Sequence, residues 1–488
     1  MPIIIPANSA AGGGGYEVTN SARFNPASND RLTRTPSSDG SRVKWTWSCW
    51  AKRGTVNQDL YLFGAYQNSS YNTFLKFASG GEIRFADVYG GSEQARINTL
   101  AKFRDLTAWY HIVVVYDKDN STATNRLIMY VNGVRITEFD GSTMTSQAST
   151  YNVDGIEIQI GALNGDGDMN GYISEVCFID NQALAPTSFG EFDEDSGIWK
   201  PIDGLADLTF GTNGYYLEMK EAGTSANSSG MGADTSGNDH HFAVNGLTAI
   251  DQTTDTCTNN FATLNPLYPT GGGYDNQSGA TFTEGATIFT TDNGDADWGF
   301  CSSSILVASG KWYVEVKYVS TDNGSAMIGI RSTPSNNDNA YIGRLANGVS
   351  YMANGDGDGD KKVAATQSAY ATEGYAAGDI IGVALDLDNN KIYFSKNGTF
   401  VNSGDPTSGS TGTGAIAVTA AASTVMGGYL IGASEVNSNG NAVFNFNFGN
   451  PSFSISSSNA DGSGFGNFEY AVPSGYFALC SKNLAGNS

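Results

Sequence analysis

One construction occurs twice in this chain, far apart in the sequence. Residues 113–134 read VVVYDKDNSTATNRLIMYVNGV, and residues 382–400 read GVALDLDNNKIYFSKNGTF. Each has an apolar run, a turn rich in Asp and Asn, a second run with an aromatic residue, and then Asn-Gly. The alternation of apolar and polar residues predicts half-buried strands, and Asn-Gly suits the positive φ angles of a two-residue hairpin turn. The repeat predicts two domains of related antiparallel architecture; two unrelated hairpins are the alternative.

The composition agrees with a β-rich chain of several domains. With 488 residues the chain is too long for one ordinary core, so two or three domains are expected. It contains 61 glycines, 11% aromatic and only 15% charged residues. This profile is typical of many short strands joined by turns and shows neither a disordered nor a collagen-like pattern.

The charge excludes some partners. The formal net charge is −23, from 49 acidic against 26 basic residues, and a field of that sign repels nucleic acid and anionic membranes. Metal ions, neutral sugars or other proteins fit better, although the acidity can also serve solubility alone. The sequence therefore predicts no nucleic-acid partner and no membrane insertion.

The cysteines and the N-terminal residues indicate the cellular compartment in which the chain assembles. The five cysteines are scattered and form no C-x-x-C pair, so neither a disulfide framework nor a zinc site is expected, and assembly in a reducing cytoplasm fits. The start, MPIIIPANSAAGGGG, lacks the basic region of a secretory signal peptide. We expect residues 1–15 to be an attachment leader, with a disordered tail as the alternative.

The segments around the first hairpin resemble a known family. They are VKWTWSCWAKRG (43–54), DLTAWYHIVVVYD (105–117) and GYISEVCFIDNQAL (171–184). Their order resembles the laminin-G-like and pentraxin-like group of the concanavalin A-like superfamily, over residues 16–200. The resemblance implies a β-sandwich with its tryptophans in the core (Trp45, Trp47, Trp50 and Trp109).

The segments around the second hairpin resemble a SPRY domain. They are SGKWYVEVKY (309–318), AMIGIRS (326–332), GYAAGDIIGV (374–383) and FNFNFGNPSF (444–453), and the match spans residues 295–455. SPRY domains are also sandwiches of the concanavalin A-like kind, which implies a core position for Trp312. The predicted fold is all-β, with two concanavalin A-like β-sandwiches of jelly-roll type. We expect residues 201–294 to be an irregular connector with partial packing, and residues 456–488 to be a C-terminal docking tail.

The module order and the connecting text resemble virion proteins of marine bacteriophages described as tail fibre or structural proteins. The stretches that carry this resemblance are SFGEFDEDSGIWKP, DTSGNDHHFAVNGLTAIDQTTDT, NNFATLNPL and YFALCSKNL. It implies a non-enzymatic virion structural protein, a tail fibre or fibre-like appendage that is assembled in the host cytoplasm and exposed on the particle. Other virion proteins and a host glycan or receptor are the implied partners, with a homo-oligomer, preferably a trimer. The alternatives are a decoration protein that binds only virion proteins and, less favoured, a glycan-cleaving enzyme.

Catalytic patterns are absent from the sequence, so we predict no catalytic residues. His111 lies in a strand pattern typical of a core histidine, and His240-His241 are adjacent residues that point opposite ways on an extended segment. Glycosidases need a pair of carboxyl groups flanking the bond that they cleave. The nearest candidate, GEFDEDSG with Glu191, follows the predicted closing strand and reads as a solvated acidic turn.

Two Asp-Gly runs suggest calcium binding. No cofactor is required for the expected function. NGDGDMNG contains Asp166 and Asp168, and NGDGDGDK contains Asp356, Asp358 and Asp360. Alternating carboxylates separated by glycine can wrap oxygen ligands around calcium. A tight solvated turn is the favoured alternative at each site.

Several loops have the composition of binding loops. GAYQNSSYNTF contributes Tyr66, Asn68 and Tyr71, ADVYGGSEQ contributes Tyr89, and RSTPSNNDNAYIGR contributes Asn337 and Tyr341. Tyrosine supplies stiff aromatic area and Ser, Asn and Gly supply adaptable hydrogen bonding. These six residues are the candidate ligand-binding set, with ordinary turns as the alternative.

Overall fold

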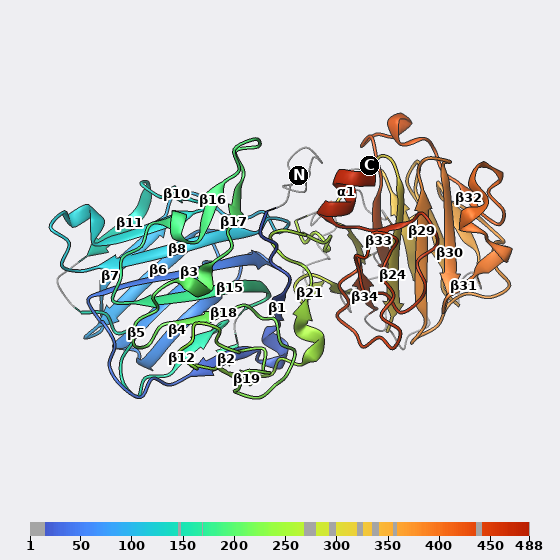
Figure 1. Ribbon diagram of the computed structural model, residues 1–488. Helices are drawn as coiled ribbons and strands as arrows, with labels where there is room; N and C mark the ends of the chain where they lie inside the picture. Colours follow the sequence, from blue (N-terminus) through green and yellow to red (C-terminus); the bar gives the residue numbers. More distant parts are fainter. Residues whose placement is uncertain are drawn as a thin grey trace. The chain divides into compact units, whose positions relative to one another are not determined.

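The computed structural model describes residues 15–144, 148–167, 169–267, 280–291, 299–319, 326–333, 341–354, 359–435 and 442–487. The chain divides into two compact units, with the boundary between Asn260 and Phe261. The unit that ends at Asn260 is called the first unit, and the unit that begins at Phe261 is called the second unit. Figure 1 shows their strands in blue to green and in yellow to red.

The first unit is a sandwich of two sheets whose neighbouring strands are antiparallel. One sheet has the order β10 (Val134–Arg135), β9 (Leu127–Val131), β8 (Tyr110–Asp117), β3 (Lys44–Arg53), β15 (Gly171–Asp180), β1 (Ser21–Phe24) and β20 (Gln252–Thr253), with β18 (Tyr215–Leu217) also on β15. The other sheet has the order β11 (Phe139–Met144), β7 (Ser92–Thr99), β6 (Ile83–Tyr89), β5 (Tyr71–Phe77), β4 (Leu60–Asn68), β12 (Ile158–Ile160), β2 (Arg31–Arg34) and β19 (Ala243–Asn245). Two small hairpins are β13 (Ala162–Leu163) with β14 (Asp166–Gly167), and β16 (Gly190–Phe192) with β17 (Trp199–Pro201).

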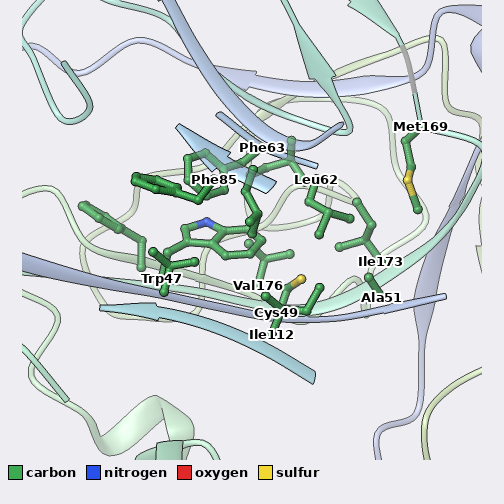
Figure 2. Close-up of a cluster of buried hydrophobic side chains, with 14 of the residues drawn as sticks. Trp47, Cys49, Ala51, Leu62, Phe63, Phe85, Ile112, Met169, Ile173 and Val176 are labelled. Atoms are coloured by element: carbon green, nitrogen blue, oxygen red, sulfur yellow. The ribbon is translucent and has the colours of Figure 1, made fainter. Parts of the chain in front are cut away.

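The core of the first unit lies between these sheets. Figure 2 shows Trp47 and Ile112 of one sheet pointing toward Phe63 and Phe85 of the other. The Trp47 and Phe63 rings are 4.6 Å apart. Such aromatic side chains bury the most apolar area per residue and account for much of the stabilisation.

The second unit repeats this plan. One sheet has the order β21 (Thr281–Thr283), β22 (Ile288–Thr290), β34 (Val443–Asn447), β24 (Lys311–Tyr318), β29 (Ile380–Asp386), β30 (Lys391–Lys396) and β31 (Thr399–Phe400); β32 (Ile416–Ala417) also pairs with β30. The facing sheet has the order β23 (Gly299–Ser302), β33 (Leu430–Glu435), β25 (Met327–Arg331), β26 (Val349–Met352), β27 (Lys361–Val363) and β28 (Thr366–Ser368). Its core contains Trp312, Val383, Ile392 and Phe394, so alternate residues of the second quoted hairpin face inward as predicted.

The predicted all-β class and the two sandwiches are confirmed. The five tryptophans expected in the cores, Trp45, Trp47, Trp50, Trp109 and Trp312, are all buried. Within the described residues the one α-helix is α1 (Ser481–Asn487). No helix in the described part of the chain has the length and apolar character to cross a bilayer.

The residues that we expected to form a connector divide between the two units. β18, β19 and β20 complete the sheets of the first unit, while β21 and β22 form the edge of a sheet in the second. Tyr216 and Phe210 pack on the outer face of β8 and β15. Those two strands are therefore buried on both faces, which explains their nearly continuous apolar sequences.

The tail after residue 455 packs onto the second unit. β35 (Phe477–Ala478) pairs in parallel with β24, and Phe468 and Tyr476 are buried against Tyr313. The carboxylate of Glu315 accepts hydrogen bonds from the backbone N–H groups of Glu469 and Tyr470, at 2.9 and 2.8 Å. The tail is thus held by a buried side chain as well as by a strand. The leader expectation falls on residues 1–15, of which 1–14 lie outside the described residues.

Candidate functional site

Four of the predicted binding residues meet at one end of a sheet in the first unit. The hairpin β4–β5 carries Tyr66, Asn68 and Tyr71, and the next hairpin, β6–β7, begins its turn at Tyr89. Tyr71 pairs directly with Tyr89 across β5 and β6, and their rings lie edge to face with centroids 5.1 Å apart. Tyr89 is 38% exposed. We call these four residues the tyrosine end.

Hydrogen bonds hold the two turns of the tyrosine end in place. The side-chain oxygen of Asn68 accepts from the backbone N–H of Ser70 at 2.9 Å, and the backbone N–H of Gly91 donates to the carbonyl of Ser70 at 3.1 Å. The amide of Asn72 donates to the carbonyl of Asn68 at 3.2 Å. The turns are therefore tied to each other, and the aromatic rings are displayed on a pre-organised support, which lowers the entropic cost of binding.

A second group, not predicted from the sequence, lies on the outer face of the same sheet. Tyr61 and Phe74 form an edge-to-face pair with centroids 5.6 Å apart. The ammonium of Lys76 lies 4.9 Å from the Tyr61 ring and 5.3 Å from the Phe74 ring, and the guanidinium of Arg84 lies 5.8 Å from the Phe74 ring. We call these four residues the aromatic–cationic face. The alternation of residues along each strand could have predicted that these side chains face away from the core. Their contacts with one another depend on the register of three strands.

Acidic side chains pair with the cations of this face. Lys76 forms an ion pair with Asp59, and Arg84 with Glu93, which also pairs with Arg96 at 3.1 Å. Burial opposes the ionisation of Asp59, but hydrogen bonds from Lys76 and from the backbone of Ser79 outweigh it and keep the pKa of this carboxyl below its usual value. An ionised carboxylate held by a lysine is suited to accept hydrogen bonds from hydroxyl groups and unsuited to donate a proton.

The remaining predicted ligand-binding residues belong to the second unit. The ammonium of Lys362 lies 4.7 Å from the ring of Tyr341, and the guanidinium of Arg344 lies 5.6 Å from it. Asn337 lies outside the described residues. The described candidate residues therefore divide between the two units, with Tyr341 in the second and the other four in the first.

The calcium prediction remains a prediction. Asp166 belongs to the short strand β14, but its side chain, together with Asp168, Asp356 and Asp358, lies outside the described residues. The carboxylate of Asp360 accepts a hydrogen bond from the amide of Gln367 at 2.9 Å. Among the residues that the structure describes, no group of three or more His, Cys, Asp or Glu side chains could hold a metal ion.

The histidines have structural roles. His111 accepts a hydrogen bond at Nδ1 from the indole of Trp199 at 3.0 Å, so its Nε2–H donates to the hydroxyl of Ser48 at 2.8 Å. Burial lowers the pKa of His111 to about 3, which keeps the ring neutral. His241 accepts from the backbone N–H of Asp234 at 3.0 Å, and His240 Nδ1 lies 3.0 Å from the carbonyl of Gly214.

The acidic stretch that resembled a glycosidase motif is on the surface. Glu191 is exposed in the hairpin β16–β17, where it and Asp193 pair with Lys200 at 3.3 and 3.1 Å. The stretch therefore forms ion pairs within a short hairpin and does not lie in either large sheet.

Comparison with known proteins now identifies the two sandwiches. Residues 26–187 match the family model described as the concanavalin A-like lectin/glucanases superfamily, and residues 311–417 match the SPRY domain. The chain contains a concanavalin A-like domain and a SPRY domain. Both domain types predicted from the sequence are confirmed. A search of the curated proteins gave no match.

Solved structures that match parts of this chain include the following three. The SPRY domain of human HERC1 is 15% identical, with a TM-score of 0.25, and the match covers 34% of this chain and 91% of that one. Domains LG4-5 of the mouse laminin alpha1 chain are 12% identical, with a TM-score of 0.29 and coverage of 97% and 89%. A putative carbohydrate binding protein from Bacteroides ovatus ATCC 8483 is 16% identical, with a TM-score of 0.31 and coverage of 48% and 60%.

Proposed function

We propose that this protein is a non-enzymatic component of a bacteriophage virion, a tail fibre or fibre-like appendage. Its concanavalin A-like domain binds a host-surface glycan, and the SPRY domain contacts a protein of the host surface or of the particle. The resemblance of the connecting segments to phage virion proteins supports the location. The two domain types support a binding role.

The observation that carries the proposal is the Tyr71–Tyr89 pair at the tyrosine end. Aromatic rings provide flat apolar surfaces for the C–H faces of sugar rings, and the two turns fix the ring positions. The ion pairs of the aromatic–cationic face lie on the same sheet, and their partly exposed members Asp59, Arg84 and Glu93 can donate to and accept from sugar hydroxyls. Weak single sites gain strongly from repeated display, so the proposal includes a homotrimer.

A glycan array with the full chain tests this function. We expect binding to a restricted set of glycans and a loss of more than about tenfold in affinity for the variant Tyr71→Ala/Tyr89→Ala, because truncation of an aromatic anchor commonly costs about 2 kcal/mol or more. Phe192→Ala is the matched control, since Phe192 is an aromatic residue of the same unit that is 49% exposed. Equal binding by both variants would refute this site.

The alternative functions give different results. A decoration protein would bind no glycan and would still be incorporated into particles. A glycan-cleaving enzyme would release reducing sugar from host polysaccharide, and Glu191→Gln would abolish that release. Sedimentation with and without a chelator measures the oligomeric state and its dependence on calcium at the Asp-Gly runs.

A further inference from the structure

Three polar side chains from distant parts of the first unit meet in its interior. The ammonium nitrogen of Lys52, on β3, lies 2.8 Å from a carboxylate oxygen of Asp255 and 2.7 Å from the side-chain carbonyl oxygen of Asn260. In the sequence, Lys52 is separated from these residues by 203 and 208 positions. The side chains of Lys52 and Asp255 are 1% and 0% exposed.

Aromatic residues contact two members of this group. Trp50, Trp109, Tyr172 and Trp199 form a buried cluster on this side of the sheet. The lysine nitrogen lies 5.4 Å from the centre of the Tyr172 ring, and the indole of Trp109 donates to the second carboxylate oxygen of Asp255 at 3.1 Å. Lys52 and Asp255 are buried away from water, which strengthens the interaction between their charges.

The amide of Asn260 is held in one orientation. Its nitrogen donates to the backbone carbonyl of Thr107 at 2.6 Å, while its oxygen faces Lys52. The carbonyl carbon is therefore presented beside the lysine nitrogen. Positioning two reactants in this way replaces an encounter in solution by an intramolecular step. This can remove a large part of the activation barrier.

We propose that Lys52 and Asn260 become joined by an intramolecular isopeptide bond, with Asp255 as the proton carrier. Asp255 takes a proton from the ammonium, and the neutral amine attacks the side-chain carbonyl carbon of Asn260. The new C–N bond forms as the bond to the amide nitrogen of Asn260 breaks. The two protons that the lysine nitrogen loses are passed to the leaving nitrogen, which departs as ammonium, and Asp255 returns to its carboxylate form. No oxidant, reductant or other reactant is consumed.

The environment supports the step that makes the amine neutral. Burial lowers the pKa of Lys52, although the charge of Asp255 opposes the shift. A desolvated lysine is a competent nucleophile. Asn260 is the acyl donor and Asp255 the proton carrier because a carboxylate resists attack by an amine and an amide cannot shuttle protons.

The bond would join the end of the first unit to a central strand of its sheet. β3 lies between β8 and β15, and Asn260 is the last residue of the unit. Tension applied to the chain at Asn260 would then reach β3 through a covalent bond.

Mass spectrometry of the intact, denatured full chain tests the proposal. We expect a mass below that of the sequence by one ammonia molecule, and a branched peptide after proteolysis that joins the segments around Lys52 and Asn260. The variants Lys52→Arg, Asn260→Ala and Asp255→Asn should have the full sequence mass. Lys311→Arg is the matched control and should keep the deficit, since Lys311 forms an ion pair with Asp386 at 3.0 Å in the other unit.

Three results would overturn the proposal. The first is a wild-type chain with the full sequence mass, a measurement that does not depend on whether any variant folds. The second is an ammonia deficit that persists in Asn260→Ala or maps to a succinimide at an Asn-Gly sequence. The third is a deficit of one water molecule together with a peptide that joins Lys52 to Asp255. That result would show that the acyl donor is Asp255 and not Asn260.

Discussion

The Asn132-Gly133 turn of the first unit and the Asn397-Gly398 turn of the second use the same local device. Asn132 and Gly133 have φ angles of 48° and 75°, and Asn397 and Gly398 have 48° and 80°, as the Asn-Gly signal predicts. The side-chain oxygen of Asn132 accepts from the backbone N–H of His111 at 2.8 Å. In the same way, Asn397 accepts from the N–H of Ile380 at 2.9 Å. Each asparagine thus joins its turn to the start of the strand paired with the one before the turn, β8 for Asn132 and β29 for Asn397.

The turns differ in what covers the glycine. Gly133 lies under the ring of Trp199, which is buried and bonded to His111. Gly398 lies under the ring of Tyr470, which is half-buried in the tail after residue 455. The hairpins follow from short-range sequence, whereas each unit covers its hairpin with a different and distant segment. Two related sandwiches can therefore be completed in unrelated ways.

Truncation of a core tryptophan in each unit should have the largest effect on stability. Trp47→Ala should destabilise the first unit and Trp312→Ala the second, each by about 3–5 kcal/mol, because truncation of a buried tryptophan loses its burial and leaves a cavity. Calorimetry of the full chain should show two transitions, of which each variant lowers one. Equal shifts of both transitions in both variants would mean that the units unfold together.

Substitution of Gly133 and of Gly398 should affect the stability of the two units to different extents. Each Gly→Ala change costs about 1–2 kcal/mol for a left-handed backbone, and a Cβ at residue 133 would lie 2.2 Å from an atom of the Trp199 ring. A Cβ at residue 398 would lie 2.5 Å from the Tyr470 ring, which can turn toward solvent. We expect Gly133→Ala to lower the stability of its unit by about 3 kcal/mol and Gly398→Ala by about 1–2 kcal/mol. Chemical denaturation measures both, and the reverse order would show that Tyr470 is the more constrained ring.

Each unit also contains a buried glutamate, and the two should differ in how well they tolerate replacement by glutamine. Glu315 accepts from two backbone N–H groups and from the amide of Asn447 at 3.1 Å, and a glutamine there cannot accept from all of them. Glu175 receives hydrogen bonds from the hydroxyls of Tyr216 and Tyr16, which can accept as well as donate. We expect Glu315→Gln to cost about 1–3 kcal/mol and Glu175→Gln less than about 1 kcal/mol. Equal losses in thermal unfolding would contradict this distinction.

Glu175 also predicts a pH dependence in the first unit. Burial raises its pKa from 4.5 to about 7, although the hydrogen bond from Tyr216 opposes the shift. The folded state therefore binds a proton more tightly than the unfolded state, so the contribution of this group is greatest below pH 4.5 and is lost as the pH rises to about 7. The loss is at most about 1.4 kcal/mol per pH unit. The difference in unfolding free energy between wild type and Glu175→Gln, measured from pH 4 to pH 8, should show this slope, and a constant difference would exclude it.

The strands and the inward-facing residues of the hairpins could be predicted because both depend on short-range sequence. Alternation distinguishes the two faces of a strand, and Asn-Gly supplies φ angles that few other dipeptides adopt. The tyrosine end was predicted in part. Loop composition singled out Tyr71 and Tyr89, while their contact depends on the pairing of β5 with β6.

Long-range packing decided the rest. The polar and weakly periodic sequence of residues 201–294 predicts a connector with partial packing. In the structure, the part of it up to Asn260 supplies short strands and single aromatic residues such as Tyr216 that complete the first unit. The aromatic–cationic face depends on the register of neighbouring strands. Lys52, Asp255 and Asn260 lie too far apart in the sequence for any local pattern to relate them. The positions of most strands follow from the sequence, since backbone angles and alternation are local properties. Which side chains share a buried space depends on segments that meet only after folding, so it follows from the three-dimensional structure.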